Sequence, residues 1–176
     1  MTAHDYQTKN AEFVAELTAL LHDRGLIANL RKWWSPTTSH FAYPILGRLR
    51  ALDDDRKTLV AALFAVHATG GRLPHSAGGA SVGTAALTLA GGPKGAGFDS
   101  MEKHFRRLLA ANDLTELGPQ LHRLVKRLER ESIPLDYARL LGDLRQFDKF
   151  SERIKTNWAL DFWQAAEPAT PDTPQS

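Results

Sequence analysis

The sequence predicts an all-α protein made of two small helical bundles joined by a glycine-rich connector. Apolar residues recur at intervals of three and four along most of the 176 residues, which is the spacing of amphipathic helices. The alternation of apolar and polar residues that marks half-buried strands is absent. Nine of the 13 glycines fall between Gly70 and Gly97, and this density of glycine indicates a connector.

The chain is expected to begin with short helical segments. Apolar residues over 13–21 repeat at three and four, and Gly25 suits the left-handed cap that ends such a helix. A short segment over residues 26–34 follows. Residues 37–39 can cap another short helix, which Pro44 limits or kinks because proline lacks an amide hydrogen.

A longer helix is expected after the three aspartates at 53–55, which can cap it and interact with the positive end of its dipole. Its apolar residues over 59–64 would line one face, with His67 at the edge of a core. The connector, residues 70–97, then has room for at most one short helix over 81–90. Its glycines lack the GxxxxGK[ST] motif that cradles a phosphate.

The two bundles divide the chain into residues 1–97, which include the connector, and residues 98–163. Four helices are expected in the second bundle, and each of the first three follows an aspartate that can cap it. The fourth runs from about Lys149 to Trp163. Residues 164–176 contain three prolines among small polar residues and are expected to form a disordered tail.

The composition excludes several classes of protein. There is no cysteine, so a disulfide scaffold, a thiolate zinc site, an iron–sulfur cluster and a cysteine nucleophile are ruled out. The longest unbroken apolar run covers residues 59–66, far shorter than the roughly 20 residues of a membrane span. The first residues lack the basic and apolar regions of a secretory signal, so the expected compartment is the cytoplasm.

No constellation of residues suggests a catalytic centre, so we expect neither enzyme activity nor a cofactor or metal. His22 and Asp23 resemble the metal-binding pair of a phosphohydrolase, but further ligands do not cluster near them in the sequence. The other histidines make no HExxH spacing, and no serine lies in a nucleophile elbow. A metal-dependent phosphohydrolase is therefore the weakest of three hypotheses.

Basic residues form two stripes in the second half. Arg123, Lys126 and Arg127 recur at three and four, so they share one side of a helix, away from its leucines. Lys149 and Arg153, four residues apart, lie further along the chain. Two such stripes on neighbouring helices would form a positive track, which neutralises phosphates and gains affinity from counterion release. The alternative interpretation is an ordinary solvated face.

A further basic feature is the run Arg31-Lys32-Trp33-Trp34. Its two cations could hold backbone phosphates while an indole stacks on a base, and such stacking tolerates any sequence. Alternatively, one or both tryptophans bury against the core and the cations cover a helix end. We expect at least one of the two indoles in the core.

An ordered series of residues resembles one protein family from about residue 10 to residue 163. The run 31–34 and the proline-containing aromatic helix after it are similar to the family's N-terminal half. The stronger similarity lies in residues 105–111, 121–125 and 133–141 and in the basic, aromatic helix that ends at Phe162-Trp163. The family is CasB, the small subunit of the type I-E CRISPR surveillance complex Cascade.

The resemblance implies a non-catalytic, all-helical subunit of two small bundles. Such a subunit pairs with a second copy of itself and lines the belly of Cascade beside the other Cascade subunits. It contacts crRNA and the displaced single-stranded DNA, and so helps to hold the R-loop open. The positions that match the family's basic surface are Arg31, Lys32, Arg107, Arg123, Lys126, Arg127, Lys149 and Arg153, of which Arg107 enters through the resemblance alone.

The runner-up hypothesis is a helical protein–protein adaptor whose basic faces bind an acidic partner. Such an adaptor would use the same cations to recognise a protein in place of nucleic acid. The two hypotheses differ in one measurable property, because only the first predicts salt-dependent binding of single-stranded DNA by the isolated chain.

Overall fold

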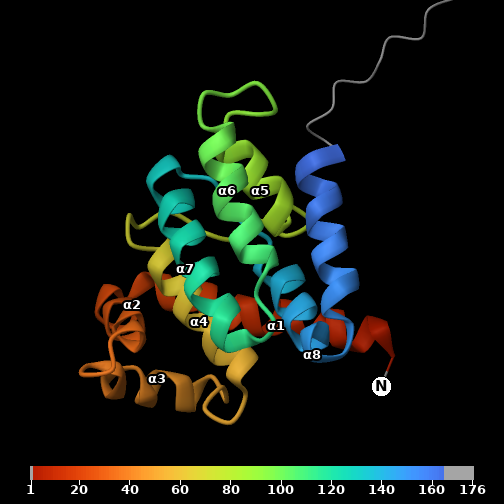
Figure 1. The fold of residues 1–176 in the computed structure, drawn as a ribbon. Helices are drawn as coiled ribbons and strands as arrows, with labels where there is room; N and C mark the ends of the chain where they lie inside the picture. Colours follow the sequence, from red (N-terminus) through yellow and green to blue (C-terminus); the bar gives the residue numbers. More distant parts are fainter. Residues whose placement is uncertain (1, 165–176) are drawn as a thin grey trace, which may run out of the picture.

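The computed structural model describes residues 2–164 and is all-α, as the sequence predicts. Its helices are α1 (Ala3–Ala19), α2 (Arg24–Arg31), α3 (Tyr43–Arg48), α4 (Asp55–His67), α5 (Val82–Leu89), α6 (Phe98–Leu109), α7 (Leu114–Glu131) and α8 (Tyr137–Ala159). The short 3-10 turns are η1 (Leu20–His22), η2 (Lys32–Trp34) and η3 (Ser39–Phe41), and a π-helical segment, η4 (Leu160–Gln164), extends α8. Figure 1 shows α2 and α3 at one end of the molecule and α5 and α6 toward the other.

Two further expectations from the sequence concern membrane-spanning helices and the C-terminal tail. None of the described helices combines the length and the apolar character that a bilayer crossing needs. The tail expected at residues 164–176 lies, apart from Gln164, outside the described residues.

Three of the helices begin at an aspartate where the sequence predicts one. Asp54 accepts hydrogen bonds from two backbone amides of the first turn of α4, at 3.0 and 3.1 Å. Asp113 and Asp136 cap α7 and α8 in the same way. Each carboxylate satisfies an amide that the first turn of a helix leaves without a partner. Asp99 does not cap, because α6 begins at Phe98 and so places Asp99 inside its first turn.

Further helix boundaries differ from the prediction. Gly25 does not end the first helix in a left-handed cap; it lies in the first turn of α2, and its φ is not positive. Pro44 does not limit a helix; it lies in the first turn of α3, where the absent amide hydrogen would have had no partner. The third and fourth helices expected in the second half are a single helix, α8, which is kinked at Phe150 (φ −134°, ψ 33°). The kink lies next to Lys149, the residue at which a new helix was expected.

Helix α4 is the centre of the core. One apolar face was expected, but every residue from Thr58 to His67 is buried. The reason is that α2, α7 and α8 all pack against α4 and together surround it. A helix that is apolar on every side is typical of such a central position.

His67 is a buried part of this core and does not lie at its edge. Its Nε2 atom lies 2.8 Å from the carbonyl oxygen of Ile133, and its Nδ1 atom lies 2.9 Å from the hydroxyl of Tyr137. Because a carbonyl only accepts, Nε2 carries the hydrogen and Nδ1 accepts from the tyrosine. Burial lowers the pKa of His67 to about 4, so the neutral imidazole joins α4 to the start of α8.

The two halves of the chain share one core. A single cluster of buried side chains extends from Phe13 on α1 to Phe162 in η4. Helix α1 packs along α8, and α4 packs along both α7 and α8. The division into residues 1–97 and 98–163 stays a prediction, and the shared core leads us to expect that the two parts unfold together.

The short helix expected in the connector is α5, which Ser81 caps. Before it, residues 74–80 are held to residues 135 and 136 by three backbone hydrogen bonds of 2.9 to 3.2 Å. Gly83 allows α5 to approach the end of α8, because a Cβ atom there would lie far inside van der Waals contact with the backbone oxygen of Trp158. This part of the glycine-rich segment is therefore packed against the second half.

Candidate nucleic-acid interface

Helix α7 carries leucines on one side and cations on the other. The leucines face the core and are buried, namely Leu117, Leu121, Leu124 and Leu128. Arg123 and Lys126 are exposed, and Arg127 is half-buried. The 3.6-residue period of the helix produces this separation, and it places the three cations on one surface.

Arg107 of α6 belongs to the same surface. Helix α6 packs beside α7, and the half-buried His104 of α6 lies within electrostatic reach of Arg127, Arg123 and Arg107. Burial is the main reason that the pKa of His104 lies below its ordinary value, and the three guanidinium groups lower it further. We call the surface formed by Arg107, Arg123, Lys126 and Arg127 the α6–α7 basic face.

The cations of the α6–α7 basic face are available to a ligand. Within the described part of the chain, none of the four forms an ion pair with a carboxylate. A guanidinium group in this state can bind the two oxygens of a phosphate with two parallel hydrogen bonds. The face therefore has the chemistry that a nucleic-acid backbone requires.

Arg31 and Lys32 lie beside this face but are partly used within the protein. The Nε of Arg31 donates to the carbonyl of Ala65 on α4 at 3.2 Å. Burial lowers the pKa of the Arg31 guanidinium, and the nearby Glu129 of α7 opposes this effect. The Nζ of Lys32 lies 4.0 Å from the centre of the Phe41 ring, in a cation–π contact. Both side chains therefore have less freedom to contact phosphate than those of α7.

Trp33 and Trp34 are half-buried and both pack against the core. The Nε1 of Trp34 donates to the carbonyl of Ala62 on α4 at 3.0 Å, and its ring stacks on His122 of α7 with 4.0 Å between centroids and 4° between planes. Trp33 meets Trp34 edge-on at 4.9 Å. Trp34 is thus half-buried, tied to α4 by its N–H and covered on one ring face by His122, and these contacts together give it a packing role in place of the base-stacking role considered from the sequence.

Lys149 and Arg153 are separated from the α6–α7 basic face. Both lie on α8, and α7 and α8 each pack against α4 without extensive contact with one another. Arg153 donates to the Oε1 of Gln146 at 2.6 Å and lies over the ring of Phe150, 4.6 Å from its centre. The single positive track expected from the two stripes is thus two separate basic surfaces, because α4 lies between their helices.

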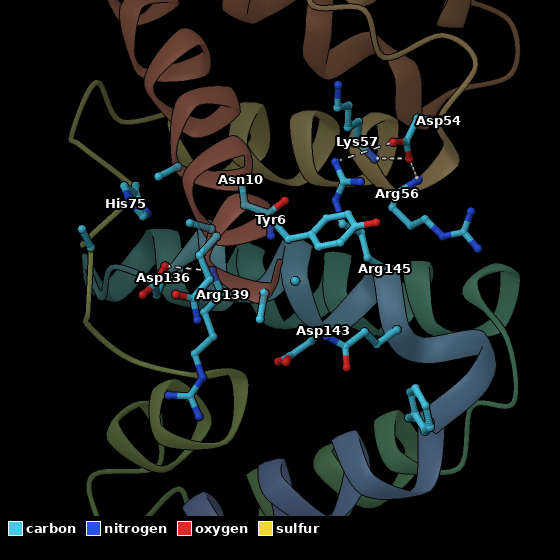
Figure 2. A pocket seen from close by; sticks show the side chains of 18 of the residues that line it. Tyr6, Asn10, Asp54, Arg56, Lys57, His75, Asp136, Arg139, Asp143 and Arg145 are labelled. Carbon is cyan, nitrogen blue, oxygen red and sulfur yellow. Dashed lines mark hydrogen bonds and ion pairs between the residues drawn. The ribbon is translucent and has the colours of Figure 1, made fainter. Parts of the chain in front are cut away.

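The second basic surface is a groove of about 1520 Å³ between α1, the start of α4, α8 and the connector. Figure 2 shows side chains of α1 and α8, among them Tyr6, Asn10 and Arg145, turned toward this space. Six basic and four acidic side chains line it, and Lys149 is one of the basic ones. We call it the α1–α8 groove.

Three of the four acidic side chains of the groove have structural partners. Asp54 and Asp136 cap helices, and Asp143 accepts a hydrogen bond of 2.8 Å from the indole of Trp158. Burial raises the pKa of Asp143 above its ordinary value. The negative charge of the groove is therefore largely engaged in holding the fold.

The structure gives no support to a phosphohydrolase centre at His22 and Asp23. Asp23 caps α2 by accepting from the amides of Gly25 and Leu26, at 2.9 and 3.2 Å. Among the described residues, no group of three or more histidine, aspartate or glutamate side chains is arranged to hold a metal ion.

A protein-family model supplies the decisive comparison. The model of the CRISPR-associated protein Cse2 matches residues 26–163, which is most of the chain. The chain belongs to the Cse2 family. All eight cations predicted from the sequence lie inside the matched range of this Cse2-family chain.

Solved structures share the fold of the Cse2-family chain. CasB from Thermobifida fusca is 22% identical, with a TM-score of 0.71 over 89% of this chain and 97% of that chain. A Cse2-family CRISPR-associated protein from Thermus thermophilus is 25% identical, with a TM-score of 0.70 over 89% of this chain and 98% of that one. CasB from Thermus thermophilus is 24% identical, with a TM-score of 0.67 over the same shares. A comparison with curated proteins finds no match. The family resemblance inferred from the sequence is confirmed.

The Cse2-family chain also contains groove residues that the sequence analysis did not select. Arg56 and Lys57 come from the start of α4, and Arg145 comes from α8. Only the packing of α1, α4 and α8 brings them together, and no spacing within one helix links them. A sequence read helix by helix holds no signal for this groove.

Proposed function

We propose that this Cse2-family chain is a non-catalytic subunit of a type I-E CRISPR Cascade complex that binds single-stranded DNA along its backbone. One observation carries the proposal. Four cations from two packed helices form the α6–α7 basic face, and none is paired with a carboxylate of residues 2–164. Backbone contacts suit the task, because a displaced strand can have any sequence.

The proposed partners are the other Cascade subunits, a second copy of this chain, crRNA and the displaced DNA strand, and the proposed compartment is the cytoplasm. The α6–α7 basic face is the main contact in this proposal. Arg31 and Lys32 add weaker contacts at its edge, since the protein already uses part of each side chain. Lys149 lines the other surface, the α1–α8 groove, and Arg153 lies over the ring of Phe150 beside it.

The proposed mechanism is thermodynamic. R-loop formation is close to balance, because the guide–target heteroduplex is about as stable as the duplex it replaces. A protein that binds the displaced strand removes the competitor for re-annealing. About 2–3 kcal/mol of such binding would shift the open state by roughly 30- to 150-fold.

The test is a variant with Arg123→Ala, Lys126→Ala and Arg127→Ala. Binding to single-stranded DNA of any sequence should weaken, since each lost phosphate contact removes about 0.7 of a released counterion. Three contacts should therefore reduce the slope of log K against log salt by roughly 2. The helical content should stay unchanged, because these side chains do not contribute to the core.

A matched control carries Arg24→Ala, Arg72→Ala and Lys94→Ala, which removes the same charge from exposed positions outside the face. This control should change the salt slope much less. An unchanged slope in the first variant, together with loss of co-purification with other Cascade subunits, would overturn the proposal in favour of the protein–protein adaptor.

A further inference from the structure

The α1–α8 groove contains two exposed aromatic rings that phosphate binding does not explain. Tyr6 of α1 is 46% exposed and Phe150 of α8 is 48% exposed, and both line the groove. The neighbouring large apolar residues of α8, Phe147 and Trp158, are by contrast fully buried. Flat apolar rings beside cations are the features on which the bases of a single strand stack.

The backbone of α8 is shaped so that Phe150 leaves the core. Phe150 has the non-helical φ and ψ angles that kink α8, whereas Phe147 and Ile154 on either side are buried. The guanidinium of Arg153 covers the Phe150 ring at 4.6 Å. The kink thus presents an aromatic ring and a cation together at the end of the groove.

Asn10 provides an unused acceptor inside the groove. Its side chain is only 4% exposed, and its Oδ1 has no hydrogen-bond partner among the described residues. Asn10 lies on the same side of α1 as the groove, and Figure 2 shows it beside Tyr6. A buried acceptor without a partner is unfavourable, so it points to a ligand that supplies an N–H donor.

Unused donors lie in the same groove. The Nε atoms of Arg56 and Arg145 are buried and have no hydrogen-bond partner in the described chain. Their terminal nitrogens pair with Asp148 and with Asp54, respectively. These pairs hold the two guanidinium groups in place at the wall of the groove, beside the space that a strand would occupy.

We propose that the α1–α8 groove binds a short segment of single-stranded DNA with its bases turned inward, against Tyr6, Phe150 and Asn10. This inference rests on the proposed function, because it assumes that the chain binds single-stranded DNA. Each of the four bases has an N–H on its Watson–Crick edge that can donate to the Oδ1 of Asn10. In a duplex that edge is occupied and the ring faces are stacked, so the groove accepts only unpaired bases.

The size of the groove favours a polymer over a small molecule. Ligand pockets for small molecules occupy about 300–1,000 Å³ and enclose most of the ligand. The α1–α8 groove is larger, at about 1520 Å³, and it is open between α1 and α8. A strand can enter and leave such a groove at its ends.

The test compares an oligothymidine with an abasic strand of equal length, which has the same phosphates and no bases. The wild-type chain should bind the oligothymidine more tightly, by roughly 5- to 150-fold for each stacked base. Tyr6→Leu and Phe150→Leu should each reduce this ratio without changing affinity for the abasic strand. Tyr43→Leu is the control, since Tyr43 is 49% exposed on α3 and lies outside the groove.

The outcomes separate this inference from the proposed function. If the wild-type chain binds both strands equally, the inference is wrong while the proposed function stands. If it binds neither strand, the proposed function itself fails. A second test, photo-crosslinking to 5-iodouracil DNA, uses the wild-type protein and so does not depend on the folding of a variant. Adducts on Tyr6 or Phe150 support the inference. Adducts confined to the α6–α7 basic face overturn it.

Discussion

The α6–α7 basic face and the α1–α8 groove are both rich in cations, but they use them differently. The four cations of the face come from two helices that follow one another in the chain, and they pair with no carboxylate of the described residues. In the groove, Arg56, Arg139 and Arg145 each pair with an aspartate. The difference teaches that a cation's position on a helix does not decide its role; the carboxylates brought near it by packing do.

The α6–α7 basic face and the α1–α8 groove both depend on the central helix α4. The most severe test is therefore to disrupt the core under the face and to ask whether the groove is lost as well. Leu124→Asp would bury an unpaired carboxylate beneath the face, at a cost of several kcal/mol, against a total stability of about 5–15 kcal/mol for a domain of this kind. We expect the whole chain to unfold, with the groove lost along with the face, as followed by circular dichroism. Arg123→Ala, one residue away on the exposed side, should leave stability nearly unchanged. Loss of only part of the helical signal in Leu124→Asp would show that the two halves fold independently.

Lowering the pH should destabilise the folded chain, and both surfaces with it, through the protonation of His67. The pKa of His67 is about 4 in the folded chain against an ordinary value of 6.5, so the unfolded state binds the extra proton first. The contribution of His67 to the free energy of unfolding is fully present above pH 6.5 and is lost as the pH falls toward 4. The total loss is about 3 kcal/mol. Chemical denaturation between pH 7 and 4.5 measures this loss. The variant His67→Gln should show a shallower decline over that range, and an equally steep one would contradict the assignment.

A smaller effect tests whether the acids of the groove are structural. Asp54→Ala removes the cap of α4 and should lower the free energy of unfolding by about 1 kcal/mol. Asp53→Ala is the matched control, because Asp53 also lines the groove but does not cap a helix. Urea denaturation compares the two. Equal losses in both variants would indicate that net charge, and not capping, governs the stability of this side of the molecule.

The sequence predicted most of the fold and one of the two surfaces. Helical periodicity placed Leu124 inside and Arg123 outside, and the aspartates at 54, 113 and 136 marked where helices begin. These features depend on neighbours a few residues apart, which a sequence displays directly. The all-round burial of α4 was missed, because apolar periodicity describes one helix and not the number of helices packed around it.

In the candidate site, even more depends on packing between segments, which a pattern within one segment does not describe. The stripe of Arg123, Lys126 and Arg127 lies on the surface as predicted, whereas Lys149 and Arg153 do not continue it. Arg31 has a carbonyl partner 34 positions further along the chain, and this partner could not be inferred from spacing. The α1–α8 groove exists only through tertiary packing, so no pattern in one segment could indicate it.

The close approach of α5 to α8 limits how this chain can vary. At position 83 the obstacle to any side chain is a backbone oxygen of Trp158, which cannot rotate away as a side chain can. At Gly71, by contrast, the space is open and only the positive φ of 72° disfavours other residues. In a library of random substitutions across residues 70–97, position 71 should therefore tolerate asparagine, whereas position 83 should return glycine alone among folded clones.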